Sequence, residues 1–372
     1  MYIYYFNILL IIIWALTFLR IKKFGKLIFI SLCFIQMFLI SLFRYGIGFD
    51  YNMYRVAFFR MGMDGFSKIS YLDWEWGFNL YTKLIVHFTK DPNIYFGITA
   101  FICLIIVAWF IYKYSSMPWL SVLLYVNLAF FYLTMNFLRQ SMALSISLLS
   151  WQFLKKRKLI PFLLIIFIAS TFHTTALIMI VVYFIVNMKP SANLLLLYGY
   201  GLLFLYIISD NIITLITNRF HEEYKGSVFL LHGLSFMYSI IPILFLIIAI
   251  IFKDKMLRTN DDNKFLLNMV FFSSFWLIAM SKHMILERMS YYTYIYIILF
   301  VPEFINCIKY YYDKNFKIGT RLRNLTKFYR IILKPSNWAI CSILIIIFVY
   351  GLSIMHTGTN GAHGVFPYKS WI

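Results

Sequence analysis

Charged and aromatic side chains gather at the ends of several apolar runs, where a membrane helix would meet water. The first group, residues 43–54, contains Arg44, Asp50, Tyr51 and Tyr54. Gly46 and Gly48 lie within it, and glycine adopts backbone angles that other residues avoid, so we predict a shaped turn here rather than a continuing helix. An arginine suits a phosphate, and a carboxylate suits proton transfer or a sugar hydroxyl. The alternative is a membrane-interface anchor with local ion pairing.

Asp50 and Tyr54 are four residues apart, so they share a face if a helix begins there. A second acidic residue, Glu75, stands between Trp74 and Trp76. A carboxylate in that position suits a general base, and the two indole faces suit stacking on a sugar ring. The alternative is an aromatic belt with a solvated glutamate.

Arg139 and Gln140 interrupt an otherwise apolar stretch. A charge near membrane depth is costly, which makes it a functional hypothesis by default. A guanidinium matches phosphate oxygens in a bidentate way, and we favour this role for Arg139 over a side chain that merely reaches the outer surface.

His173 lies at a break between two short apolar runs, 159–171 and 174–187. It suits a general base or a hydrogen-bond donor to a substrate oxygen, while the alternative is a histidine that bridges two helices.

Nearer the C-terminus, His283, Glu287 and Tyr291 recur every four residues and are predicted to share one helical face. Arg288 stands beside them as another candidate for a phosphate, with an interfacial ion pair to Glu287 as the alternative.

The composition requires a membrane protein with several spans. Hydrophobic residues make up 62% of the 372 residues and charged residues only 13%, whereas a soluble domain carries about 25% charged residues. The net charge of +20 comes from basic residues in short loops between apolar runs, which is the pattern that marks cytoplasmic loops and argues against nucleic-acid binding. The four cysteines show neither a metal-ligand spacing nor a disulfide framework.

We predict an all-α polytopic fold with about 12 transmembrane helices. The apolar runs are residues 3–19, 27–43, 94–112, 118–135, 140–154, 159–171, 174–187, 192–208, 234–252, 265–281, 289–307 and 338–355. The pair 159–171 and 174–187 is a candidate for a broken or re-entrant span. Residues 74–89 are predicted to form an amphipathic helix at the outer interface. The chain is then a single transmembrane domain, 1–372, with external regions 44–93 and 209–233 and a basic cytoplasmic loop at 309–334.

The motifs together resemble the EpsG family of bacterial exopolysaccharide and O-antigen polymerases (Wzy-type). The resemblance rests on five segments in the family's order: Arg44–Tyr51 followed by Tyr54, Arg139–Ala143, Phe172–His173, Glu287–Tyr291 and Pro367–Lys369. Phe49 and Thr175 depart from the family's pattern. No P-loop, HExxH or GxSxG motif is present, so the sequence supports neither ATP-driven transport nor those hydrolase chemistries.

The resemblance implies a glycosyltransferase of GT-C-like architecture, independent of metal and of any cofactor, in the bacterial inner membrane with its site facing the periplasm. It would move a growing glycan from undecaprenyl diphosphate onto the next lipid-linked repeat unit. Its partners would be undecaprenyl-diphosphate-linked oligosaccharides, membrane lipids and a chain-length regulator protein, with no nucleic acid.

Residue roles follow from that reaction. The diphosphate leaving group needs cations, for which the candidates are Arg44, Arg139 and Arg288. The attacking hydroxyl needs a base, for which the candidates are Asp50, His173 and Glu75. Residues expected to hold sugars or other parts of the substrate are Tyr51, Tyr54, Gln140, Trp74, Trp76, Glu287 and Tyr291.

Two other functions remain open on the sequence. A flippase of the lipid-linked unit would place polar residues inside central spans and on both faces, whereas here they gather toward one face. A transferase that adds a single sugar or acyl group from a lipid donor would share the architecture, and only the length of its product would separate it from a polymerase.

Overall fold

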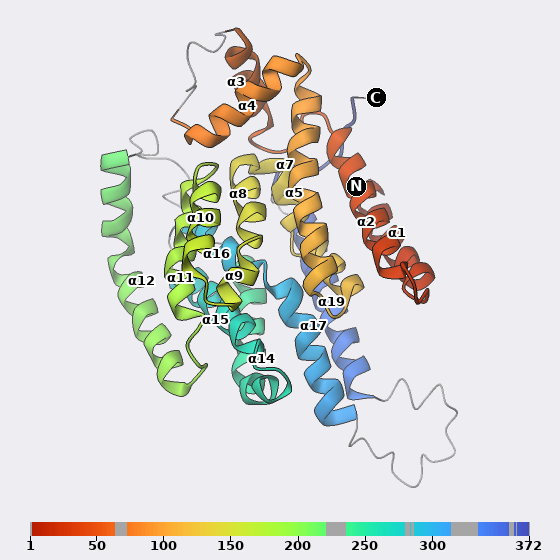
Figure 1. Ribbon diagram of the computed structural model, residues 1–372, viewed down its shortest axis with the longest axis vertical. Helices are drawn as coiled ribbons and strands as arrows, with labels where there is room; N and C mark the ends of the chain where they lie inside the picture. The colour runs from red at the N-terminus through yellow and green to blue at the C-terminus, as the bar shows by residue number, and fades with distance from the viewer. Residues whose placement is uncertain are drawn as a thin grey trace. The chain divides into compact units, whose positions relative to one another are not determined.

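The structure is a computed structural model of the chain, and it describes residues 2–63, 73–220, 236–279, 283, 286–313, 334–356, 361 and 363–371. Within these ranges every regular element is a helix, as Figure 1 shows. An isolated antiparallel bridge between Arg44 and Ser370 is the only β pairing among the described residues. The prediction of an all-α fold is confirmed for this part of the chain.

The chain divides into two compact units, residues 1–177 with 341–372 and residues 178–340. The first unit contains α1 (Tyr2–Phe18), α2 (Gly25–Leu42), α3 (Tyr51–Met63), α4 (Trp76–Phe88), α5 (Pro92–Tyr114), α6 (Pro118–Asn127), α7 (Phe130–Asn136), α8 (Leu138–Leu148), α9 (Trp151–Lys155), α10 (Leu159–Ser170) and the 3₁₀ turn η2 (Thr174–Leu177). The last helix, α19 (Pro335–His356), begins in the second unit and continues into the first.

In the first unit, α2 packs between α1 and α5, and α5 packs on α8, which in turn contacts α10. The short helices α3 and α4 lie against each other beside the beginning of α5 (Figure 1). The α5 start is fixed locally, because Pro92 occupies the first turn and the Asp91 carboxylate accepts a hydrogen bond from the Asn93 amide at 2.8 Å. Much of the described part of the predicted external region 44–93 is therefore helical, and the predicted helix at 74–89 is α4.

The turn predicted after α2 is confirmed. Helix α2 ends at Leu42, and Gly46 and Gly48 follow with φ of 63° and 102°. Gly48 also lies so close to the backbone of Met135 that a side chain would overlap the carbonyl. Glycine is thus required at position 48 both by its backbone angle and by its contact with α7.

Two predicted spans are broken in the structure. Helices α6 and α7 meet at an angle of 47°, where Ala129 adopts the left-handed conformation with φ of 68°. The run predicted to break near His173 does so, because α10 ends at Ser170 and the 3₁₀ turn η2 begins at Thr174. His173 therefore lies at a helix end, where a side chain can reach another element.

The second unit contains α11 (Ile178–Ile185), α12 (Ala192–Phe220), α14 (Phe236–Thr259), α15 (Asn263–Ala279), α16 (Glu287–Tyr294), α17 (Ile297–Ile308) and the π-helical turn η5 (Lys309–Asp313). Helix α15 is central and contacts α12, α14, α16 and α17. Residues 209–220 of the predicted external region 209–233 continue α12, and the remainder lies outside the described residues. Of the predicted basic loop 309–334, residues 314–333 also lie outside them.

In the part of the chain that the structure describes, four helices are long and apolar enough to cross a membrane: Gly25–Leu42, Pro92–Tyr114, Ala192–Asn211 and Pro335–His356. The number rises to six if each of the two bent pairs forms one span. The protein is therefore an all-α membrane protein, while about 12 spans and a GT-C architecture stay predictions.

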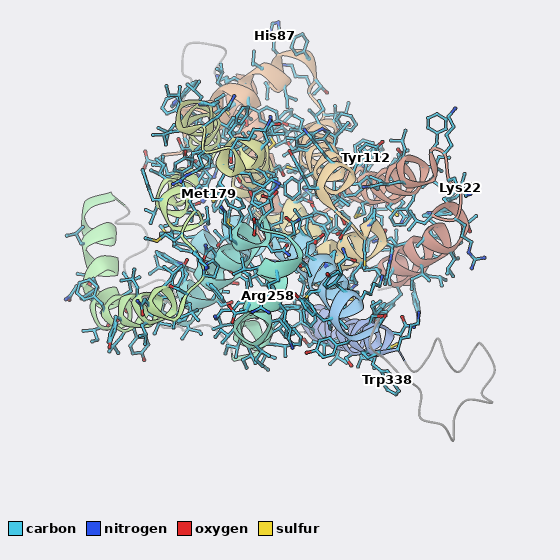
Figure 2. The ribbon with its side chains drawn as sticks, turned by 60° about the horizontal axis from the view of Figure 1, so that its bottom comes forward. Lys22, His87, Tyr112, Met179, Arg258 and Trp338 are labelled. Atoms are coloured by element: carbon cyan, nitrogen blue, oxygen red, sulfur yellow. The ribbon has the colours of Figure 1, made fainter. Side chains whose placement is uncertain are left out.

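On the short connection between α1 and α2, Lys22 points away from the helices, as Figure 2 shows.

Candidate active site

The carboxylate of Glu75 joins two other predicted site residues. Its Oε2 lies 2.7 Å from Nη1 of Arg139, and its Oε1 lies 2.8 Å from Nδ1 of His173. The Thr174 amide also donates to Oε1, at 3.0 Å. These residues come from the start of α4, the start of α8 and the break after α10, and all belong to the first unit.

Glu75 reaches His173 because α4 begins in direct contact with the end of α10. The Phe78 amide donates to the Thr171 carbonyl at 3.1 Å. A Cβ at Gly77 would overlap the Thr171 side chain, so only glycine permits this approach. Glu75 is placed just before the first turn of α4, and its own carbonyl accepts a hydrogen bond from the Asn79 amide at 3.0 Å.

Arg139 is held on three sides. Besides its ion pair with Glu75, its guanidinium carbon lies 5.3 Å from the ring centre of Trp74, a cation–π distance. The hydroxyl of Tyr54 is also within hydrogen-bonding reach of Arg139. The charge of Arg139 is therefore compensated by Glu75, and its role as a diphosphate ligand stays a prediction.

The electrostatics keep Glu75 ionised. Burial raises the pKa of this carboxyl group, but the hydrogen bond and charge of His173 and the charge of Arg139 outweigh burial and lower the pKa to about 2. A glutamate held in this way is a poor proton acceptor near neutral pH. It is suited to orienting its partners instead.

The arrangement fixes which nitrogen of His173 can exchange a proton. With Nδ1 directed at the ionised Glu75 carboxylate, the neutral ring keeps its hydrogen on Nδ1 and its lone pair on Nε2. A carboxylate on one nitrogen raises the basicity of the other and stabilises the charged imidazolium that forms. Of the three predicted base candidates, the structure brings His173 and Glu75 into contact, and which of the three acts as the base stays a prediction.

Arg44 lies in the turn after α2, also in the first unit, and only 1% of its surface is exposed. None of its three guanidinium nitrogens has a hydrogen-bond partner among the described residues. Its surroundings are aromatic: the guanidinium carbon lies 5.1 Å from the Phe96 ring centre. Burial lowers the pKa of Arg44 to about 10, so the side chain remains a cation at neutral pH, and no carboxylate of the described residues forms an ion pair with it.

Tyr95 connects the two arginines. Its hydroxyl lies close enough to both Arg44 and Arg139 for each charge to interact with it. Two of the three candidate arginines, Arg44 and Arg139, thus interact with the same buried tyrosine. The third, Arg288, lies on α16 in the second unit, and its role at the same site stays a prediction.

The remaining candidates in the first unit take different positions. Asp50 directly precedes α3, and its carbonyl accepts from the Tyr54 amide at 3.1 Å, so the two residues are one turn apart as predicted. Tyr51 and Tyr54 are each 2% exposed, and their role in holding sugars stays a prediction. Trp74 is buried against Tyr54, with ring centres 5.3 Å apart, whereas Trp76 is exposed.

Gln140 is buried on α8, next to Arg139. In the second unit, the Tyr291 hydroxyl donates to Oε1 of Glu287 at 2.6 Å, which confirms that these two share a face of α16. His283 does not share it, because α16 begins only at Glu287. The His283 ring instead contacts Asp210 on α12, with Nε2 and Oδ1 2.9 Å apart.

Sequence reasoning missed the part played by the C-terminal segment. His363 is buried, its Nδ1 has no hydrogen-bond partner among the described residues, and burial lowers its pKa to about 4. Its ring lies edge-on to Phe137, with centres 5.8 Å apart, at the junction of α7 and α8. Pro367–Lys369 of this segment contributed to the family resemblance, but the local sequence does not say where the segment packs.

Comparison with known proteins agrees with the resemblance read from the motifs. No curated protein and no solved structure is similar enough to the chain to match it. The family model described as "EpsG family" matches residues 27–322, a range that contains the Glu75, Arg139 and His173 cluster as well as Arg44 and Arg288. The chain belongs to the EpsG family.

Proposed function

We propose that this protein is a polysaccharide polymerase. It transfers a growing exopolysaccharide or O-antigen glycan from undecaprenyl diphosphate to a hydroxyl of the next lipid-linked repeat unit, at the outer face of the bacterial inner membrane. The observation that carries the proposal is the Glu75 carboxylate, which holds His173 at 2.8 Å and Arg139 at 2.7 Å. Membership of the EpsG family supports the same reaction class.

In the proposed reaction, Nε2 of His173 accepts the proton of the attacking sugar hydroxyl. The hydroxyl oxygen forms a bond to the anomeric carbon of the growing glycan, and the bond from that carbon to the diphosphate oxygen breaks. Glu75 holds the ring of His173 and stabilises its charged form, while Arg139 fixes Glu75. Asp50 remains a second candidate base.

The departing diphosphate gains negative charge as its bond breaks, so it requires a cation that is not already paired. Arg44 meets this requirement, because its guanidinium is buried and makes no hydrogen bond with any described residue. Arg288 is the proposed second cation. Trp76 is exposed at the start of α4, beside Glu75, and is the residue proposed to stack on a sugar of the acceptor.

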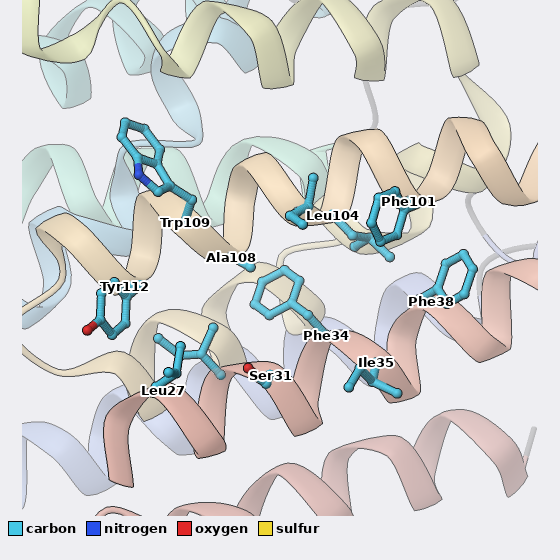
Figure 3. A pocket seen from close by; sticks show the side chains of 12 residues that line it. Leu27, Ser31, Phe34, Ile35, Phe38, Phe101, Leu104, Ala108, Trp109 and Tyr112 are labelled. Carbon is cyan, nitrogen blue, oxygen red and sulfur yellow. The ribbon is translucent and has the colours of Figure 1, made fainter. Parts of the chain in front are cut away.

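A lipid substrate also needs an apolar channel at membrane depth. A groove of about 360 Å³ runs between α2 and α5, two of the helices long enough to span the membrane. Figure 3 shows side chains from both helices along it, including Phe34, Ile35 and Leu104. Arg44 follows α2 directly and contacts Phe96 near the start of α5, so this groove is the proposed path of a polyprenyl chain.

Complementation tests the proposal. Cells that lack the gene receive the wild type, His173→Gln or Glu75→Gln, and surface polysaccharide is separated by length on a gel. We expect long chains from the wild type and single repeat units from both variants. The matched control is His87→Gln, because His87 is exposed at the end of α4 (Figure 2) and lies outside the site.

The same gel separates the alternatives. Cells that lack a flippase would present no repeat unit at the outer face, and cells that lack a single-sugar or acyl transferase would carry chains of normal length with altered units. Wild-type chain length from His173→Gln protein, present at normal levels in the membrane, would remove His173 as the base. Purified protein with synthetic lipid-linked repeat units would then test the reaction directly.

A further inference from the structure

The C-terminal segment 363–371, which we name the strap, covers the turn that carries Arg44. The backbone hydrogen bonds that hold it run from Tyr45 N to Lys369 O (2.9 Å), from Trp371 N to Phe43 O (3.2 Å) and from Gly48 N to Gly364 O (2.9 Å). Side chains add bonds from the Tyr4 hydroxyl to Val365 O (2.9 Å), from the Tyr368 hydroxyl to Ile40 O (2.9 Å) and from Trp371 Nε1 to Leu42 O (3.0 Å). The strap is therefore seated on the end of α2 and the turn after it.

The pairing of the strap with the turn determines which side chains face inward. Arg44 and Ser370 stand opposite each other in an antiparallel bridge, so Tyr368, two residues before Ser370, points to the same face as Arg44. Tyr368 is accordingly near enough to Arg44 to interact with its charge. Tyr45 and Lys369 point to the opposite face and are exposed.

The walls around Arg44 are aromatic, and no acceptor among the described residues lies within hydrogen-bonding distance of its guanidinium nitrogens. Four tyrosines, Tyr4, Tyr51, Tyr95 and Tyr368, interact with its charge without forming a hydrogen bond to it. A buried cation without a partner is costly. An anion with several acceptor oxygens would repay that cost by accepting from the free guanidinium hydrogens.

We propose that Arg44 is an occluded diphosphate-binding site and that the strap is its gate. Three walls of the site are helices, α1, α3 and α5, whereas the strap has no regular structure of its own and is held by the hydrogen bonds given above and by its buried side chains Val365 and Phe366. Separating these contacts uncovers Arg44 without unfolding a helix. The strap lifts to admit the diphosphate and closes over it, with Tyr368 as the inner surface of the gate.

This inference deepens the proposed function and rests on it for the source of the diphosphate, which is the head group of the lipid-linked glycan. A free diphosphate has the same chemistry, so the experiment includes both. The readout is chemical labelling of Arg44 by phenylglyoxal, followed by mass spectrometry of the peptide. It does not depend on polymerisation.

The strap can be locked shut through its outward face. Tyr45 and Lys369 are opposed across the antiparallel pairing, where Cα atoms are about 5.5 Å apart, a spacing that a disulfide spans. The test protein carries Tyr45→Cys and Lys369→Cys, with Cys341→Ser because Cys341 is the exposed native cysteine among the described residues. Both substitutions lie on exposed side chains, so the fold is retained.

We expect Arg44 to be labelled in the reduced protein and to lose that labelling when the disulfide forms. Inorganic pyrophosphate should protect Arg44 in the reduced protein. Undecaprenyl diphosphate in the micelle should protect it at a lower concentration if the lipid head group is the natural ligand, and undecaprenol, which has no phosphate, should not protect it. The single variant Tyr45→Cys controls for the substitution and should be labelled under both redox conditions.

A second variant opens the strap. Gly364 has φ of 66°, and an added Cβ would stand 2.8 Å from the Phe49 amide nitrogen, so Gly364→Ala should prevent the strap from seating and increase the labelling of Arg44. Equal labelling of the reduced and locked proteins would overturn the gate, and labelling that no diphosphate changes would overturn the site. If labelling behaves as expected while the protein makes no polymer, the polymerase proposal fails and the gated diphosphate site stands.

Discussion

Gly77 lies so close to Thr171 that a single methyl group at Gly77 would overlap the threonine side chain. This contact places the start of α4 on the end of α10. Because Glu75 precedes α4 and His173 follows α10, the approach of the two helix ends determines whether the carboxylate reaches the imidazole. The geometry of the proposed base thus depends on a residue that carries no side chain.

Gly77→Ala should therefore disable the site without touching a charged residue. The added methyl group pushes α4 from Thr171 and lengthens the 2.8 Å contact between Glu75 and His173, so we expect single repeat units in place of long chains. The measurement is polysaccharide length together with protein level in the membrane. Gly201→Ala is the matched control, since a Cβ there meets no atom within 4 Å. Normal chain length from Gly77→Ala would contradict this account.

The ionised state of Glu75 gives a pH dependence of stability. Its pKa in the folded protein is about 2, below the ordinary value of 4.5, so Glu75 stabilises the fold fully above pH 4.5 and loses that contribution as the pH falls toward 2. We expect Glu75→Gln to melt at a lower temperature than the wild type at pH 6. The difference should shrink between pH 4.5 and 3. A melting difference in detergent that does not change with pH would argue against an ionised Glu75.

Glu75 and Arg139 should behave as a unit. Removing either partner leaves the other charge partly buried and unpaired, because their side chains are 11% and 17% exposed, and such a loss costs about 3 kcal/mol. The double variant Glu75→Gln with Arg139→Gln should be destabilised by much less than the sum of the two single variants. Melting temperatures of the four proteins in one detergent provide the measurement, and additive effects would mean that the pair contributes little.

Unlike Glu75 and Arg139, whose loss should lower stability, Arg44 should be needed for activity and not for stability. Its buried guanidinium has no hydrogen-bond partner among the described residues, so Arg44→Met removes an uncompensated charge while it keeps apolar contact with Phe96. We expect the melting temperature to stay the same or rise and long polymer to disappear. Arg44→Lys keeps the charge but loses the planar fork that suits a diphosphate, and should also fail to make long chains. A large loss of stability in Arg44→Met would indicate a structural role instead.

His173 can be tested apart from its packing. His173→Asn retains a side-chain amide that can donate to Glu75 but provides no proton acceptor of suitable pKa. We expect this variant to melt close to the wild type and to make no long chains. Chain length and melting temperature, measured on the same preparations, separate the chemical role from a structural one, and restored polymerisation would show that the base lies elsewhere, with Asp50 the next candidate.

The sequence by itself determined the membrane class, the helices and the main turn. Apolar runs such as 27–43 and 94–112 became α2 and α5 almost to the residue, because in a membrane each backbone group must be paired within its own helix. The turn after α2 was likewise predictable, since Gly46 and Gly48 allow positive φ. These are local properties of the chain, and local sequence is sufficient to encode them.

Only the tertiary structure decided which charges meet. Glu75 is 64 residues from Arg139 and 98 from His173, and no periodicity links residues on separate helices. Arg139 pairs with Glu75, whereas the guanidinium of Arg44, beneath the C-terminal strap, has no hydrogen-bond partner among the described residues. Burial and partner choice are properties of the packed protein, because they depend on which helix ends approach each other in space.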